Sequence, residues 1–258
     1  MKNKGETDTR AAACSNHAGL IFYFSTGQPR VSYLNQNRHF SSMINLPKKW
    51  TAELAEETGW HAGDGSMNFY KKRGLYQLRG HIKDDRKHYL ERIKPIFKKV
   101  YNIDIHLREM PKTGVFGFQI WNNTLVSFKN KKLKLPLGKK IDYKIPTEIL
   151  NDNNLKIAFL RGIFDTDGCI YIENKRGRPY PRAEIRIACN KLSEKIKVMC
   201  LSLGIRTTRY VQNRDKDNWS TIYCISIRGR EMVSRWFNIV SPKNSKHITK
   251  WDEYLSSK

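Results

Sequence analysis

An internal repeat is the feature that most limits how this chain can fold. Residues 57–70 read ETGWHAGDGSMNFY, and residues 160–173 read LRGIFDTDGCIYIE. Each copy has a glycine, then five residues later an Asp-Gly pair, then a strand-like run. Asp64 and Asp167 therefore correspond, at a separation of 167 − 64 = 103 residues. A unit of this length is close to ordinary domain size and exceeds solenoid periods, so two related domains fused in one chain are predicted.

The segments that follow the two motifs also correspond. Residues 77–105 and residues 184–208 each read as a strand, a short polar break and an amphipathic helix, with apolar residues at three- and four-residue steps. A β-rich stretch comes next in each copy, FGFQIWNN at 116–123 and STIYCISIRG at 220–229. Each half is thus predicted to contain a helix, two strands, a helix, two strands and further helix, which is an α+β fold with two pseudo-symmetric halves.

The same comparison divides the chain into four parts. Residues 1–45 have no counterpart in the repeat and form an N-terminal extension with weak structural signals, for which disorder is one option. The first half spans 46–135 and the second half 155–258. The stretch between them, 136–154, is rich in Lys, Pro and Asn and is predicted to be a linker.

The charge of the chain points to a polyanionic partner. Its 258 residues include 48 Lys+Arg and 24 Asp+Glu, a formal net charge of +24. Nucleic acid is the first candidate and an anionic membrane surface the second. No apolar run approaches the roughly 18 residues of a membrane span, and Leu20–Phe24 is too short for a signal-peptide core.

Cysteine usage bears on the compartment. The five cysteines are odd in number and never spaced as CxxC. This argues against a disulfide framework and against a structural zinc site. The expected location is intracellular and reducing, in the cytoplasm of a prokaryote or in an organelle.

The glycines before the two aspartates predict close helix packing. On a helix Gly59 and Gly63 share a face, and Gly162 and Thr166 occupy the same positions in the second copy. Small residues at this spacing allow two helix backbones to approach closely. If the two faces meet, Asp64 and Asp167 emerge side by side at the helix C-termini.

Two carboxylates in that position require a counter-charge. The helix dipole disfavours acids at a C-terminus, and the two carboxylates repel each other. A divalent cation held by Asp64 and Asp167, with carbonyl oxygens of Gly63 and Thr166, would offset both effects. Oxygen ligands of this kind suit Mg²⁺, and a metal beside a phosphate can assist an in-line displacement. An Asp-Gly pair alone is more often a turn, and the second motif lacks the spacing of an EF-hand loop.

The two motifs, GWHAGDG and LRGIFDTDG, resemble the signature helices of the LAGLIDADG homing endonucleases in their monomeric, two-motif form. The resemblance implies an αββαββα fold in each half, signature helices packed at the interface, and two antiparallel sheets that form a DNA-binding saddle. It also implies a site-specific double-strand cut in a long DNA target, dependent on Mg²⁺ (Mn²⁺ or Ca²⁺ in the same site), with short 3′ overhangs. The first motif departs from the family pattern at Glu56, Glu57 and His61, where apolar or small residues are usual.

The resemblance further implies a basic residue near each metal, just before the segment that ends each half. In the first half this is Lys139 or Lys140, and in the second it is Lys243 or Lys246. A cation beside the scissile phosphate can stabilise developing charge or orient the attacking water. Asp64 and Asp167 would bind the metal.

Predicted strands carry the candidate DNA contacts. A β-ribbon fits the major groove, and alternate strand residues face one way. Arg, Gln and Asn can read base edges, while Lys mostly contacts phosphate. The alternative is a solvated outer sheet face. The candidates are Lys71, Lys72, Arg73, Arg79, His81, Lys83, Arg108, Lys112, Gln119, Asn122, Arg176, Arg178, Arg182, Glu184, Arg186, Asn190, Lys191, Arg206, Arg209, Gln212 and Arg214.

Three functions remain open at this point. The first is a site-specific DNA endonuclease, intron-encoded or free-standing. The second is a maturase that helps an intron RNA fold, and the third is a non-cleaving DNA-binding protein on the same fold. Retention of both aspartates favours cleavage. An intein is disfavoured because the chain starts with Met and ends in Ser-Ser-Lys.

Overall fold

The computed structural model describes residues 44–213 and 221–257. The predicted N-terminal extension, apart from its last two residues, and the predicted contact Arg214 therefore lie outside the described residues. In the part that is described, no helix has the length and apolar character needed to cross a membrane.

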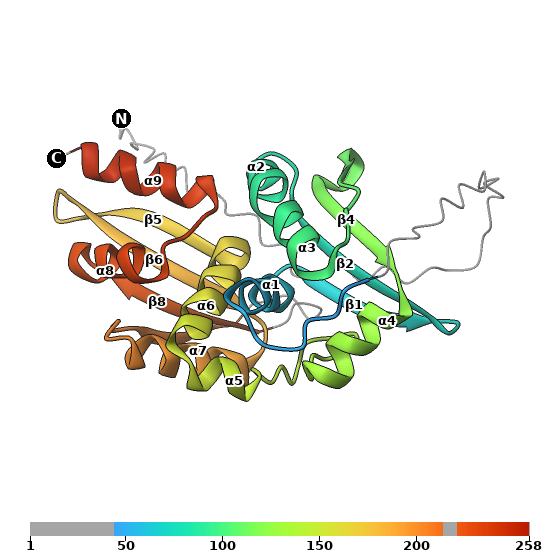
Figure 1. The fold of residues 1–258 in the computed structure, drawn as a ribbon. Coiled ribbons are helices and arrows are strands. Elements are labelled where there is room, and N and C mark those ends of the chain that lie inside the picture. The colour runs from blue at the N-terminus through green and yellow to red at the C-terminus, as the bar shows by residue number, and fades with distance from the viewer. Residues whose placement is uncertain (1–43, 214–220, 258) are drawn as a thin grey trace. The chain divides into compact units, whose positions relative to one another are not determined.

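The first half is built around a four-stranded sheet (Figure 1). It begins with helix α1 (Ala52–Ala62), followed by strands β1 (Gly65–Tyr70) and β2 (Arg73–His81). A continuous helical segment comes next, made of α2 (Arg86–His88), the π-helical η1 (Tyr89–Ile93) and α3 (Lys94–Tyr101). The half then continues with β3 (Arg108–Met110), the short 3₁₀ turn η2 (Pro111–Thr113) and β4 (Val115–Trp121). It closes with α4 (Asn123–Ser127) and the π-helical η3 (Phe128–Lys132).

The second half repeats the same order. After the short helix α5 (Thr147–Asn151) in the connecting segment, α6 (Asn153–Asp167) leads into β5 (Gly168–Lys175) and β6 (Arg178–Ile187). Helix α7 (Asn190–Ser202) precedes β7 (Thr208–Gln212) and β8 (Ile222–Arg228), and α8 (Arg230–Val240) and α9 (Ser245–Ser256) follow. The predicted α+β fold with two pseudo-symmetric halves is confirmed.

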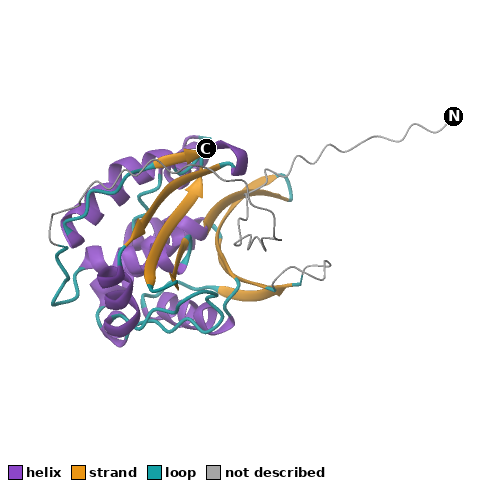
Figure 2. Cartoon of the chain, turned by 90° about the vertical axis from the view of Figure 1, so that its right-hand side faces the viewer, coloured by secondary structure: helices purple, strands orange, loops and turns teal. Residues whose placement is uncertain are grey.

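Both sheets are antiparallel and have equivalent strand orders, β1-β2-β4-β3 and β5-β6-β8-β7. Each sheet places its helices on one face (Figure 2), where alternate residues such as Tyr76 and Leu78 of β2 are fully buried. The residues between them, such as Gln77 and Arg79, face the other way and are less buried. Each sheet therefore has a helix-covered face and an open face.

Two-residue turns fix the register of the first hairpin in each half. Tyr70 pairs with Arg73 and Lys175 with Arg178, which leaves Lys71-Lys72 and Arg176-Gly177 as the loops. All four loop residues have positive φ, between 46° and 76°. This is the geometry that matches the twist of a hairpin, although three of the four positions lack the glycine that favours it.

The described cysteines are mostly small core residues. Cys189, Cys200 and Cys224 are free, buried thiols.

Candidate functional site

Helices α1 and α6 cross at their glycines, as the spacing predicts. A Cβ atom added to Gly162 would overlap the carbonyl oxygen of Glu56 and would lie 3.1 Å from the Cα of Gly59. One added to Gly59 would lie 2.8 Å from the backbone nitrogen of Ile163. Real Cβ atoms show almost no contacts this short with backbone, so only glycine permits the crossing.

The crossing brings the two motif aspartates together. A Cβ on Gly63 would lie 3.3 Å from Cγ of Asp167, so the end of α1 touches the end of α6. Asp64 and Asp167 are half-buried. Burial raises the pKa of Asp64 well above its usual range, and the charges of Asp167 and Asp85 raise it further. Burial also raises the pKa of Asp167, to about 6, although Lys140 and Lys246 oppose the shift.

One lysine from each predicted pair reaches this cluster. The Lys140 ammonium group donates to the carbonyl oxygens at the end of α1, at 3.1 Å to His61, 2.8 Å to Ala62 and closer still to Gly63. Lys246 lies 3.5 Å from the carbonyl oxygen of Thr166, at the end of α6.

The other two lysines point elsewhere. Lys139 is exposed. Lys243 is also exposed, and its Nζ donates to the Ser241 hydroxyl at 3.0 Å. Its backbone N–H instead donates to both carboxylate oxygens of Asp165, at 3.0 Å each. The geometry therefore favours Lys140 and Lys246 over Lys139 and Lys243.

The oxygen atoms at this place fit a hard divalent cation. Two carboxylates lie beside helix-terminal carbonyls, and the ammonium groups that reach the same carbonyls show that the cluster attracts positive charge. Among the described residues, no three His, Cys, Asp or Glu side chains are grouped to hold a metal by themselves. Asp64, Asp167, Gly63 and Thr166 would hold the ion together with solvent or substrate oxygens.

Of the polar residues that interrupt the first motif, Glu56 and Glu57 have charged partners, whereas the ring nitrogens of His61 have no hydrogen-bond partner in the described structure. Glu57, fully buried, accepts from Lys129 Nζ at 2.5 Å and from the hydroxyls of Tyr76 and Tyr101 at 2.8 and 2.9 Å. His61 is buried and stacks on the Tyr76 ring, with 5.6 Å between ring centroids.

Glu56 connects the two halves. Its carboxylate receives two 2.8 Å hydrogen bonds from Arg92 of the first half and one of 3.1 Å from Arg161 of the second. Arg161 also donates to the carbonyl oxygens of Val240 and Ser241. The departures from the motif thus create ion pairs that replace apolar packing around α1.

The open face of the first sheet presents many of the predicted DNA contacts. Gln119 lies opposite Gln77, which was not among the predicted contacts, and Arg79 and Arg108 both lie opposite Gly117 of β4. Partial burial, followed by the charge of Arg108, lowers the pKa of Arg79. Two neighbouring guanidinium groups on one face favour binding of an anion. Other predicted contacts on this face or its turns are Lys71, Lys72, Arg73, His81, Lys83 and Lys112.

On the open face of the second sheet, more of the side chains are bonded to one another. Glu184 is fully buried, and it accepts from Arg186 Nε and the Tyr210 hydroxyl at 2.6 Å each. Arg182 lies 3.7 Å from the same carboxylate and 3.0 Å from Glu173. Glu184 thus orders the arginines around it, and its oxygens already have partners. Arg176, Arg178 and Gln212 are exposed at the edges of this sheet.

Several predicted contacts lie away from the open faces. Arg209 points toward α7, where its Nε donates to the Ser193 hydroxyl at 2.7 Å and its Nη2 to the side chain of Asn190. Arg206 pairs with Glu231 of α8 at 3.8 Å.

The side chains of two more predicted contacts are bonded to other groups of the protein. Lys191 pairs with Asp142 at 2.8 Å, and that hydrogen bond raises the Lys191 pKa. The Asn122 side chain caps α4 by accepting from the backbone N–H of Leu125 at 2.8 Å. Alternation along a strand predicts two faces, but it does not say which one the helices cover.

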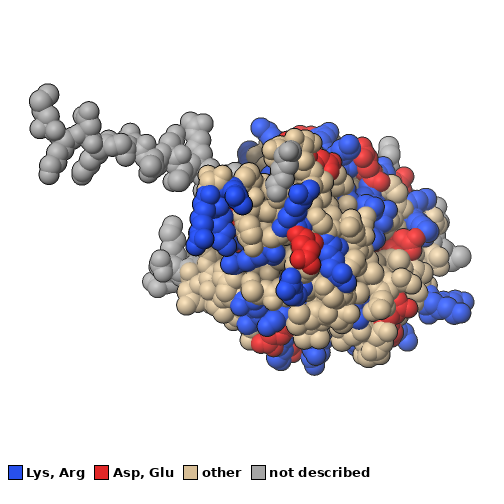
Figure 3. Space-filling view, turned by 90° about the vertical axis from the view of Figure 1, so that its left-hand side faces the viewer, with Lys and Arg blue, Asp and Glu red and all other residues tan. Residues whose placement is uncertain are grey.

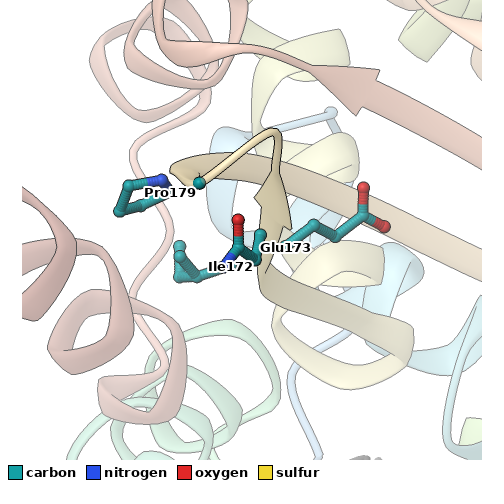
Figure 4. Close-up of a pocket in the computed structure, with 5 residues that line it drawn as sticks. Ile172, Glu173 and Pro179 are labelled. Carbon is teal, nitrogen blue, oxygen red and sulfur yellow. The ribbon is translucent and has the colours of Figure 1, made fainter.

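A shallow hollow at the β5–β6 hairpin is separate from this cluster. Ile172, Glu173, Asn174, Gly177 and Pro179 line it. It lies at the far end of β5 from Asp167, and the Glu173 carboxylate points away from Ile172 and Pro179 (Figure 4). The hollow presents no group that could take part in chemistry at the aspartates.

Sequence reasoning missed a hydrogen-bonded group that holds Lys246, formed by Asp85, Asn244 and Asp165. Asp85 accepts from Lys246 Nζ and from Asn244 Nδ2 at 2.7 Å each. Asn244 also donates to the Asp165 carbonyl oxygen at 2.9 Å. The pair Asp84-Asp85 at the end of a predicted strand was the available signal, but it does not reveal a partner 161 residues away.

Basic side chains are spread widely over the surface. On the face that lies to the left in Figure 1, Lys and Arg groups outnumber the acidic ones between them (Figure 3). This agrees with the net charge of +24 and with a polyanionic partner.

Comparison with known proteins identifies the fold. Residues 154–240, within the second half, match the family model described as the LAGLIDADG-like domain. The homing endonuclease I-DmoI in complex with DNA and Mn has a TM-score of 0.52 and 16% identity, over 74% of this chain and 98% of that one. I-DmoI in complex with DNA and Ca gives 0.52 and 16%, over 73% and 88%. At this identity the likeness shows the fold.

One protein of known activity is similar to this chain in sequence. The glutamine–fructose-6-phosphate aminotransferase of Methanocaldococcus jannaschii is 26% identical over 196 residues, which is 76% of this chain but 17% of that protein. The chain thus corresponds to a small part of that enzyme, so its aminotransferase activity is not carried over.

Proposed function

We propose that this chain, which has the LAGLIDADG fold with two signature helices, is a site-specific endonuclease that cuts both strands of a long DNA target. The observation that carries the proposal is the pair Asp64 and Asp167 at the meeting point of α1 and α6. A lysine lies near each carboxylate. The strand that begins directly after each aspartate belongs to a sheet with an open, polar face. A protein that only bound DNA would have no need to bury two acids beside a polyanion.

The proposed chemistry is hydrolysis of one phosphodiester in each strand. Asp64 and Asp167 would bind Mg²⁺, which when bound supplies charge stabilisation at the phosphoryl group and a more acidic water. Support for a divalent cation comes from the oxygen-only donor set and from the similar I-DmoI structures, which contain Mn or Ca. Lys140 and Lys246 would each stabilise negative charge that develops on one phosphate.

DNA binding is proposed to use the open sheet faces. Arg79, Arg108 and Gln119 of the first sheet are free to meet base edges or phosphates. On the second sheet Arg182 and Arg186 are held in place by Glu184, which lowers the entropy lost when they meet DNA. With two halves in one chain, a monomer would suffice for both strands, and the expected setting is an intracellular one.

The first test is cleavage of a randomised duplex library by the purified protein, with and without Mg²⁺, followed by sequencing of the cut ends. The proposal expects a cut at one long motif, dependent on Mg²⁺ and with a short 3′ stagger. Salt-sensitive retention of DNA or intron RNA without any cut would overturn it in favour of a binding protein or maturase.

The site assignment has its own test. Asp64→Asn and Asp167→Asn keep the side-chain size but remove the charge that holds a cation, so each variant should lose double-strand cleavage and retain DNA binding. Asp104→Asn is the control, because Asp104 is 63% exposed and paired with Lys94. Full cleavage by both site variants would refute the assignment.

A further inference from the structure

The two lysines of the site occupy equivalent positions in the two halves. Lys140 contacts the carbonyl oxygens at the end of α1, and Lys246 approaches the carbonyl oxygen of Thr166 at the end of α6. Their separation is 246 − 140 = 106 residues, close to the 103 that separate Asp64 and Asp167. Each lysine thus contacts the signature-helix end of its own half, while its charge acts more strongly on the aspartate of the other half, Lys140 on Asp167 and Lys246 on Asp64.

A second pair of equivalent residues faces these lysines from the opposite halves. Asp85 is the N-cap residue of α2 and Cys189 that of α7, at a separation of 189 − 85 = 104 residues. Asp85 of the first half bonds to Lys246 of the second. Cys189 of the second half donates its thiol to the carbonyl oxygen of Ile141, the neighbour of Lys140 in the first, at 3.1 Å.

This pair breaks the pseudo-symmetry of the site. Lys246 forms a 2.7 Å ion pair with Asp85, which is 6% exposed, and Asn244 holds the same carboxylate oxygen at 2.7 Å. The backbone N–H of His81 donates to the other oxygen at 2.7 Å. The corresponding residue near Lys140 is Cys189 and not a carboxylate, so Lys140 is bound by carbonyl oxygens and carries no such ion pair among the described residues.

We propose that Asp85 is a positioning residue that restrains Lys246 and makes the two half-sites unequal. The carboxylate neutralises the lysine and competes with a phosphate for its ammonium group, whereas Lys140 is free of this competition. The DNA strand served by Lys140 is therefore cut first, and a nicked duplex accumulates before the second cut. This inference rests on the proposed endonuclease function.

The test measures the cutting of each strand separately, on a duplex target labelled at both 5′ ends, in Mg²⁺. The wild-type protein should cut one strand about tenfold faster than the other, as expected for one competing charge contact. Asp85→Asn removes the charge and keeps an acceptor for His81 N–H or Asn244. It should speed up the slow strand only, and bring the two rates together.

The reciprocal exchange supplies the matched control. Cys189→Asp places a carboxylate at the equivalent position beside Lys140, at an N-cap where aspartate is favourable. It should slow the strand that is fast in the wild type and leave the other unchanged. If Asp85 had a purely structural role, Asp85→Asn would slow the cutting of both strands together and would lower the unfolding temperature. Thermal unfolding of each variant is therefore measured alongside the two rates.

The possible results distinguish a failure of the proposed role of Asp85 from a failure of the proposed endonuclease function. Equal strand rates in the wild type, or a slow strand that does not speed up in Asp85→Asn, overturn the inference while endonuclease activity stands. A protein that cuts neither strand overturns the proposed function, and the inference with it.

Discussion

Buried histidines show how a single residue can make stability depend on pH. His88 is 3% exposed, lies against the edge of Trp60 at 5.9 Å between ring centroids, and has no hydrogen-bond partner for either ring nitrogen in the described structure. Burial lowers its pKa from 6.5 to about 4, although Asp85 and Glu56 oppose the shift. The unfolded chain therefore binds a proton that the folded chain rejects, and stability falls as the pH drops from 6.5 toward 4.

Replacing His88 by Phe should remove this part of the acid sensitivity. With pKa values of 6.5 unfolded and about 4 folded, the wild type loses about 2 kcal/mol between pH 8 and pH 5 through this group. The unfolding free energy of His88→Phe relative to that of the wild type should therefore rise by about the same amount from pH 8 to pH 5. Urea unfolding at both pH values measures it, with His106→Gln at an exposed histidine as the control. A stability difference that does not change with pH would contradict the assignment.

At the scale of helices and strands, the crossing of α1 and α6 depends on glycine. In an exposed helix a Gly→Ala change usually stabilises by about 1 kcal/mol. At Gly162 the new methyl group would overlap the carbonyl oxygen of Glu56 and meet the Cα of Gly59 at 3.1 Å. Gly162→Ala should therefore destabilise the protein by about 3 kcal/mol, because the helices must separate. Chemical denaturation provides the measurement.

Gly114→Ala is the comparison for this change. A Cβ there meets nothing within 4 Å, so the cost is limited to a φ of +65° in the left-handed region, about 1 kcal/mol. If the two variants lose the same stability, the close helix crossing is not what glycine provides at position 162.

The elements were predictable because they occur twice. The repeat located both signature helices, their glycine contact and the convergence of Asp64 and Asp167. Interactions present in one half alone were not predictable. Glu57 and Lys129 are 72 residues apart, and nothing local shows that this lysine enters the core to pair with that glutamate. The contact between Asp85 and Lys246 was equally unpredictable, because it depends on how the two halves pack against each other.

The net charge of +24 governs the behaviour of the whole molecule toward DNA. Each phosphate contact releases counterions, so affinity falls steeply as salt rises. The position of a basic residue decides whether it takes part. Arg79 lies on the open face of the first sheet beside Arg108, whereas Arg209 lies on the covered face of the second sheet and is bonded to Ser193 of α7.

These two arginines give opposite expectations for the same substitution. Arg79→Gln should weaken DNA binding and reduce the slope of log affinity against log salt by about 1, because one phosphate contact is lost. Arg209→Gln removes the same formal charge but should leave that slope unchanged, and should instead lower stability by about 1 kcal/mol through the lost hydrogen bonds to α7. Fluorescence anisotropy across a salt series, paired with thermal unfolding, separates the two effects. Equal slopes for both variants would mean that net charge alone drives binding, and that the open sheet face is not the surface that meets DNA.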